Sequence, residues 1–465
     1  MNKRAMSLDA LRGLAIVGMV LSATLGPGLP SWMHHAQEPP PSFSYNPAIS
    51  GITWVDLVFP LFLFAMGAAF PLSIGKRASR GESRLKITSD ILKRGLKLAF
   101  FSVYVQHFYP YMLNPEGGVG VWSISILSFA LLFPMFMKLP WQMPSSVRTG
   151  IKAAAYLAGT ALLLAVCKEP IGFDVLKTNN PILLILAYMS VLGGLSYLFT
   201  IGKPLLRCAI IVLLSAFTVG STVDGSWHSA VSMFNPIEGF YQPDYIKYLL
   251  IVLPATFAGG RMKRWANVEA ERFKPKPFAA GISMAAVSLA VVAANLYFLF
   301  TRQMVWGVVS TSVLLLGGLA MLSWLARGRR LWNDLFSAGA FLILLGLMLE
   351  PLGGGIKKDP PTLSYLFVTC GIGFMFLFVF HVFCDCLGME KPLNFLSMPG
   401  QNPMVAYVAG DLLINPLLNI VGVFPVLLAF FARSPLLALV QGLFLTSLSV
   451  LITMFFTRMR WFWRT

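Results

Sequence analysis

The chain has 465 residues, of which 57% are hydrophobic and only 12% are charged, and its mean hydropathy is +0.72. These values exclude a soluble fold of this length and indicate a polytopic membrane protein. The net charge of +17 could indicate binding to nucleic acid. The basic residues, however, fall between apolar segments and form no polar domain, so we expect no nucleic-acid partner.

Apolar segments long enough to cross about 30 Å of hydrocarbon recur along the whole chain. The first resembles a signal-peptide core, but no small-x-small cleavage site follows, so we expect an uncleaved first helix. We predict an all-α transmembrane bundle, a single domain over 1–465, with N-terminal helices and an outer histidine-containing loop in 7–138 and the remaining bundle in 139–465. About 14 spans (range 11–14) are predicted by length, near 8–28, 54–75, 93–112, 119–138, 149–167, 181–200, 205–221, 246–260, 278–300, 304–326, 334–352, 363–385, 400–420 and 434–457.

The Lys and Arg residues divide unevenly between the two sides that this order of spans defines. The side of the N-terminus holds 28 of the 36, the opposite side holds 7, and Arg12 lies inside the first span. By the positive-inside rule both termini are cytoplasmic. Loops 29–53 and 353–362 then face outward, whereas the short basic loops 76–97 and 261–277 face inward.

Ionisable side chains inside apolar spans are few, and each is a functional candidate because burying charge in hydrocarbon costs free energy. Asp9 and Arg12 are three residues apart on one helix face, where they can neutralise each other. Asp56 opens the second span, just after Trp54. His381 and Asp385 are four residues apart, a spacing that favours a hydrogen-bonded pair. The alternative is a role in binding. Asn402 and Gln401 lie in the proline-broken segment 400–420.

The five cysteines lie within or at the ends of predicted spans, which implies neither a disulfide framework nor a zinc site. Cys384 and Cys386 flank Asp385, but two thiols two residues apart without a second pair make a poor four-ligand site. We therefore expect no metal.

Two motifs carry a resemblance to a known family. Ser7-Leu-Asp-Ala-Leu-Arg-Gly-Leu-Ala15 is followed by a polar loop containing His34 and His35, and then by Trp54-Val-Asp-Leu-Val-Phe-Pro-Leu-Phe-Leu-Phe-Ala-Met-Gly67. This order resembles the transmembrane acetyltransferases typified by heparan-α-glucosaminide N-acetyltransferase, and most closely their bacterial NagX-like branch. A further similarity is Pro399-Gly-Gln-Asn-Pro-Met-Val-Ala-Tyr407, where the family has a Gly-x-Asn motif.

The resemblance implies an enzyme of the bacterial inner membrane that moves an acetyl group from cytoplasmic acetyl-CoA to an amino sugar on the far side of the membrane. It places a histidine, here His35 or His34, at the catalytic centre. The histidine lies further from Asp56 than in the family, as though the Pro-rich stretch 39–53 were inserted. The family precedent is also compatible with a homodimer.

General chemistry suggests a role for each candidate residue. A near-neutral imidazole can relay the acetyl group or act as a base, and Asp56 can orient it. Asn402 can donate a hydrogen bond to the thioester oxygen. We expect Arg94, Lys97 and Gln401 to bind the cofactor, and Trp54, Asp9 and Arg12 to bind the substrate.

Two other functions fit the same residues. A transporter of N-acetylglucosamine or a related sugar would also use intramembrane Asp, Asn, Gln and aromatic side chains. The third hypothesis is a non-catalytic relative of the enzymes that binds sugar or lipid. Binding or slow hydrolysis of labelled acetyl-CoA distinguishes the enzyme from both.

Overall fold

The protein is an all-helical, polytopic membrane bundle, as the sequence predicts. The computed structural model describes residues 6–139, 143–166, 178–237, 239–269, 278–325, 329–389 and 391–464. Over these residues the only extended pairing is an isolated bridge between Met137 and Trp463. Eleven of the described helices are long and apolar enough to cross a membrane.

Every predicted span contains a described helix. In chain order the α-helices are α1 (Met6–Thr24), α2 (Trp54–Ser79), α3 (Arg84–Phe108), α4 (Pro110–Leu113), α5 (Val119–Phe136), α6 (Ser145–Val166), α7 (Pro181–Phe199), α8 (Pro204–Gly220), α9 (Trp227–Met233), α10 (Leu249–Arg264), α11 (Phe278–Phe300), α12 (Met304–Leu325), α13 (Arg330–Met348), α14 (Leu363–Phe380), α15 (Asn394–Gln401), α16 (Pro403–Ala409), α17 (Asn415–Ile420), α18 (Val423–Phe431) and α19 (Pro435–Arg458). Short 3-10 helices are η1 (Ser31–Met33) and η2 (Pro243–Tyr248), and π-helical segments are η3 (Trp265–Glu269), η5 (His381–Cys386) and η6 (Gly410–Ile414).

The basic stretch 76–97, predicted as an inward loop, is mostly helical. α2 continues to Ser79, and α3 begins at Arg84 after Ser83, whose side chain accepts a hydrogen bond from the backbone N–H of Lys86. Lys and Arg are good helix formers, so the helices extend past the apolar segments that hydropathy detects. Arg94 is consequently held on a regular helix.

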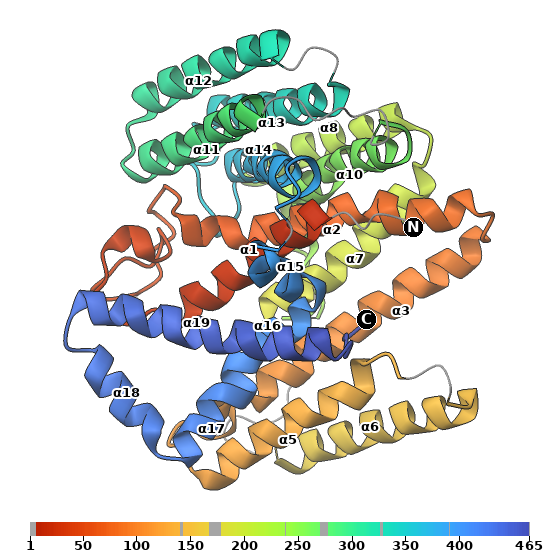
Figure 1. Cartoon of the computed structure of the whole chain (residues 1–465), viewed down its shortest axis with the longest axis vertical. Coiled ribbons are helices and arrows are strands. Elements are labelled where there is room, and N and C mark those ends of the chain that lie inside the picture. The colour runs from red at the N-terminus through yellow and green to blue at the C-terminus, as the bar shows by residue number, and fades with distance from the viewer. Residues whose placement is uncertain are drawn as a thin grey trace.

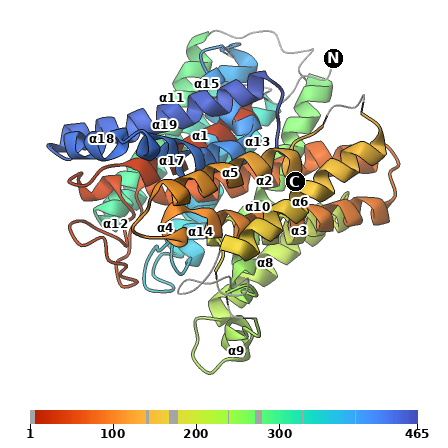
Figure 2. The same cartoon turned by 90° about the horizontal axis from the view of Figure 1, so that it is seen from below.

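α1, α2, α7 and α15 occupy the middle of the bundle (Figure 1). α11, α12 and α13 lie on one side of them, and α5, α6 and α17–α19 lie on the other. α14 is the most buried of the candidate spans, since 89% of its apolar window is buried. α9 and its flanking segments project from the body in the view from below (Figure 2).

α1 is packed unusually closely against α15 at two glycines. A Cβ built on Gly13 would lie 1.8 Å from the carbonyl oxygen of Leu396, and one built on Gly400 would lie 1.9 Å from that of Asp9. Small residues allow helix backbones to approach this closely in membranes. The contact fixes the start of α16 beside the first half of α1.

Candidate active site

The loop between α1 and α2 folds back over the first turn of α2, where Asp56 is the third helical residue. The backbone N–H and the hydroxyl of Thr53 both donate to Asp56 Oδ2, at 2.9 and 3.2 Å. This is a capping box, in which an acidic side chain satisfies the N–H of the residue before the helix. The backbone N–H of Ala36 also donates to Oδ2, at 3.2 Å.

The second oxygen of Asp56 faces His35. Oδ1 lies 2.8 Å from His35 Nδ1, and the Asp56 side chain is only 2% exposed, whereas that of His35 is 33% exposed. When Nδ1–H donates to Oδ1, Nε2 keeps its lone pair and can accept a proton or act as a nucleophile. The loop imidazole that meets Asp56 is therefore that of His35.

Lys358, from the loop before α14, completes a three-residue cluster. Its Nζ lies 2.9 Å from Nδ1 and 3.3 Å from Nε2 of His35, and 3.9 Å from Oδ1 of Asp56. Burial lowers the pKa of Lys358 from its usual value, and the carboxylates of Asp56, Glu38 and Asp359 oppose that shift. A partly buried cation thus stands beside an imidazole and a carboxylate.

Hydrogen bonds hold the loop before α2 and the loop before α14 together around this cluster. The backbone N–H of Asp359 donates to Gln37 Oε1 at 2.9 Å, and the Tyr45 hydroxyl donates to the Asp359 carbonyl at 2.7 Å. Beneath them, the hydroxyl of Tyr365 donates to the carbonyl of Asp56 at 2.7 Å. The loops that the sequence places on one side of the membrane therefore meet.

His34 has different surroundings from His35. Its carbonyl accepts a hydrogen bond from the Thr53 hydroxyl at 2.7 Å, and its ring packs edge-on against Phe43 at 4.9 Å. Burial, and then the neighbouring His35, lower the pKa of His34. The geometry gives His34 a structural contact and gives His35 the contact with Asp56.

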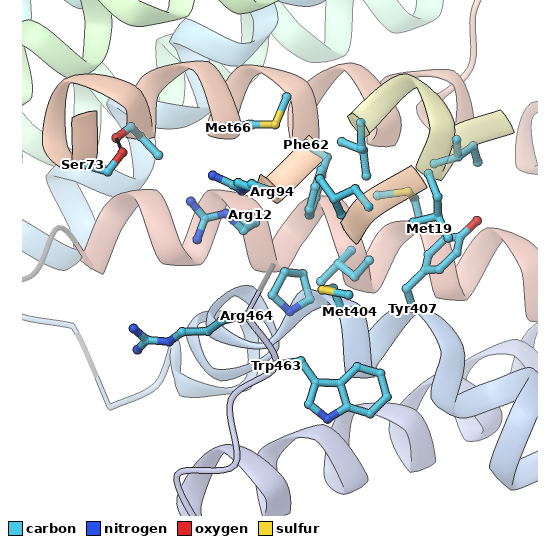
Figure 3. A pocket seen from close by; sticks show the side chains of 17 residues that line it. Arg12, Met19, Phe62, Met66, Ser73, Arg94, Met404, Tyr407, Trp463 and Arg464 are labelled. Carbon is cyan, nitrogen blue, oxygen red and sulfur yellow. Dashed lines mark hydrogen bonds between the residues drawn. The ribbon is translucent and has the colours of Figure 1, made fainter. Parts of the chain in front are cut away.

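A cavity of about 320 Å³ lies inside the bundle. Arg12, Arg94 and Arg464 line one end, and Met19 and Tyr407 line the other (Figure 3). Most of the lining between them is apolar. Such a cavity suits a long ligand that has anionic groups at one end and an uncharged arm.

Trp54 lies between this cavity and the histidine loop. It packs against a cluster that contains Ile16 and Met19, and also against a second cluster that contains Met33. Its predicted role in substrate binding stays a prediction, since its described contacts are apolar packing.

Two of the predicted cofactor and substrate residues line the cavity, Arg94 and Arg12. Arg12 NH1 donates to Asp9 Oδ1 at 3.4 Å and to the Gly400 carbonyl at 3.2 Å, so the expected Asp9–Arg12 pair is present. Lys97 and Gln401 are not among the lining residues.

Asn402 is not brought to the His35–Asp56 pair. It is fully buried after α15, where its Nδ2 donates to the Trp461 carbonyl at 3.0 Å and its Oδ1 accepts from the Trp463 N–H at 3.1 Å. These contacts hold the segment after α19 against the bundle. They give Asn402 a structural role, and its predicted hydrogen bond to a thioester stays a prediction.

The sequence reasoning missed Lys358, Tyr407 and Arg464. A signal existed for Lys358, because it is one of few basic residues on the side predicted to be poor in Lys and Arg. Tyr407 and Arg464 had no comparable signal, since only the packing of α16 and the chain after α19 places them at the cavity.

Comparisons with known proteins give a family and partial relatives. A family model described as "Domain of unknown function (DUF5009)" matches residues 4–262, which is more than half of the chain and includes His35, Asp56 and Arg94. Heparan-alpha-glucosaminide N-acetyltransferase of Mus musculus is 35% identical over 102 residues, and the Homo sapiens protein of that name is 32% identical over 102 residues. Each match covers 22% of this chain and 14% of the relative.

Proposed function

The chain belongs to the family described as a domain of unknown function, DUF5009. From the geometry around His35 and the partial relatives, we propose that it is a membrane-embedded acetyltransferase. It would take an acetyl group from cytoplasmic acetyl-CoA and pass it to an amino sugar or another sugar-containing acceptor on the opposite side of the membrane. The partial similarity to two N-acetyltransferases supports the type of reaction. We also propose that the chain belongs with the bacterial, NagX-like members of that group and acts in the inner membrane.

The contact between His35 and Asp56 carries the proposal. Acyl transfer to an amine requires a base that takes the amine proton while the nitrogen attacks the thioester carbon. With Nδ1–H held by the Asp56 carboxylate at 2.8 Å, Nε2 of His35 can take that proton, or can itself accept the acetyl group before the amine does. In both routes the carbon–sulfur bond breaks and the CoA thiolate leaves.

Lys358 adds a positive charge where the reaction develops a negative one. Its Nζ is within 3.3 Å of both ring nitrogens of His35, so an acyl carbon that reaches His35 brings its oxygen near the ammonium group. A fixed cation that meets the developing oxyanion stabilises the transition state more than the ground state.

The arginine-ended cavity supports acetyl-CoA as the donor. Arg12, Arg94 and Arg464 suit the phosphates, and the apolar section suits the arm that carries the thioester. The far end, at Met19, lies in the apolar cluster that also contacts Trp54. Trp54 begins the helix that holds Asp56, so the Met19 end of the cavity is the end nearer the histidine cluster.

The test compares two neighbouring histidines. Purified protein is given labelled acetyl-CoA and an amino sugar, and acetylated product is measured for wild type, His35→Ala and His34→Ala. We expect His35→Ala to lose activity by about 10²-fold or more, the usual contribution of a positioned base, and His34→Ala to lose much less.

Two controls accompany this comparison. The melting temperature of each variant shows whether it is folded. Sugar flux into liposomes in the absence of acetyl-CoA would favour the transporter instead, and equal activity of the two histidine variants would remove His35 from the mechanism.

A further inference from the structure

The end of α14 distant from the histidine loop carries a second set of reactive side chains. His381 Nδ1 lies 2.9 Å from Asp385 Oδ2, as predicted for a hydrogen-bonded pair, and His381 Nε2 lies 3.5 Å from Cys386 Sγ. α14 has 18 residues, so about 27 Å of helix separate this cluster from the loop that holds Lys358. The cluster is therefore independent of the His35 site.

A local change of helix type creates this arrangement. Residues 381–386 form a π-helix, in which the N–H of Leu387 donates to the carbonyl of Val382, five residues earlier, at 2.9 Å. In an α-helix, two residues five positions apart point to different faces. The wider turn of a π-helix places the later residue on the same side as the earlier one. Both Asp385 and Cys386 can then contact His381. Single π-helical turns are frequently found at functional sites.

Asp385, His381 and Cys386 are arranged in the order found around an activated cysteine nucleophile. Asp385 accepts the Nδ1–H of His381, which leaves the Nε2 lone pair directed at the thiol of Cys386. A base oriented by a carboxylate and in contact with a thiol is the general arrangement for nucleophilic catalysis by cysteine. Cys386 is a free, half-buried cysteine, while His381 is fully buried behind it.

The surroundings fix the imidazole and supply positive charge. The ring of Trp265 packs edge-on against His381 at 4.6 Å, directly after the exposed Arg264 that ends α10. Burial lowers the pKa of Arg329, and an electrostatic interaction with Cys386 opposes that shift.

We propose that Cys386 is an acyl-accepting nucleophile that takes the acyl group of a CoA thioester from the Arg-rich side of the membrane. The Sγ–H proton passes to His381 Nε2, and Sγ attacks the thioester carbonyl carbon. A new carbon–sulfur bond forms to Cys386, and the bond to the CoA sulfur breaks. His381 returns the proton to the CoA thiolate, so the products are acyl-Cys386 and free CoA.

A CoA thioester suits this site by charge and by position. Arg264 and Arg329 can meet its phosphates, as guanidinium groups do in many phosphate sites. The thiol ends a membrane helix, where the acyl chain of a fatty acyl-CoA would enter lipid and a short acetyl group would remain at the surface. The acyl length is decided by experiment.

The full-length protein in lipid nanodiscs is incubated in parallel with acetyl-CoA and with palmitoyl-CoA. Hydroxylamine-sensitive acylation is located and timed by peptide mass spectrometry. Cys208 is the control within the same molecule, because it is exposed and makes no described hydrogen bond to a histidine. We expect Cys386 to be acylated at least about tenfold faster than Cys208, although Cys208 is more exposed. The donor that gives the higher rate identifies the source of the acyl group.

The role of Asp385 is tested by a variant of the same size. Asp385→Asn is expected to slow acylation of Cys386 about tenfold and to move the pH profile of its alkylation by iodoacetamide to higher pH, because the imidazolium that accompanies the thiolate loses its carboxylate partner. His35→Ala should leave this acylation unchanged, so the inference stands or falls separately from the proposed function. Acylation of Cys386 no faster than that of Cys208 with both donors, or an unchanged pH profile in Asp385→Asn, would overturn it.

Discussion

At the scale of single residues, Asp56 shows how one carboxylate serves both the fold and the site. Oδ2 closes the capping box with Thr53, and Oδ1 orients His35. The nearly complete burial of Asp56 makes both contacts strong, because the surroundings contain little competing water.

Arg94 and Lys97 provide a matched pair for testing the donor site. Both are cations on α3, but only Arg94 lines the cavity. Arg94→Gln should weaken acetyl-CoA binding about tenfold, since a hydrogen bond to a charged group is worth about 1.5–3 kcal/mol and 1.4 kcal/mol is a factor of ten. Titration calorimetry at two salt concentrations measures this, and the loss should shrink at high salt. Lys97→Gln should change the affinity less than about twofold, and equal losses in both variants would place the CoA phosphates elsewhere.

At the scale of elements, the glycine contacts between α1 and α15 position one end of the cavity. Gly13 and Gly400 allow backbone contact, and one consequence is the hydrogen bond from Arg12 to the carbonyl of Gly400 at 3.2 Å. A side chain at either glycine would push α15 away from α1. The guanidinium of Arg12 would then lose this partner.

Gly13→Ala should therefore destabilise the protein by about 1–3 kcal/mol or more, the usual cost of overpacking. Gly317→Ala is the control, because Gly317 is in the middle of α12 and a Cβ there would have no neighbour within 4 Å. That variant should be as stable as wild type or up to about 1 kcal/mol more stable. Thermal unfolding in detergent measures both, and a Gly13→Ala variant as stable as Gly317→Ala would show that the two helices can separate without cost.

At the scale of the whole molecule, the two clusters lie at opposite ends of the helices. His35 and Lys358 meet at the loops before α2 and α14, whereas the His381–Asp385–Cys386 cluster lies at the other end of α14. α1 and α19 are antiparallel neighbours, since the N–H of Gly26 donates to the carbonyl of Ala438. The start of α1 and the end of α19 are therefore at the same end of the bundle (Figure 1).

The direction of the bundle in the membrane can be tested with two exposed serines. In a variant whose five cysteines are replaced by serine, Ser44→Cys marks the histidine loop and Ser79→Cys marks the end of α2. The charge distribution predicts that a membrane-impermeant maleimide labels Ser44→Cys in intact cells and labels Ser79→Cys only after permeabilisation. The reverse pattern would invert the orientation and the direction of acetyl transfer.

The sequence alone determined the class of fold and the local pairs. Hydropathy located a helix in each predicted span, and spacings of three and four residues correctly paired Asp9 with Arg12 and His381 with Asp385. These features depend on the period of a helix and on the thickness of a membrane, which act on residues close together in the chain.

Only the tertiary structure decided which distant residues meet. Lys358 contacts His35 across 323 positions, and the cavity joins Arg12, Arg94 and Arg464 from three separate segments. The π-helix that turns Cys386 toward His381 also left no signal in hydropathy, because its six residues are too few for a change of helical period to be recognised. Such contacts follow from how helices pack and how loops cross over them. Local patterns in a single sequence predict helices but do not predict how those helices are arranged.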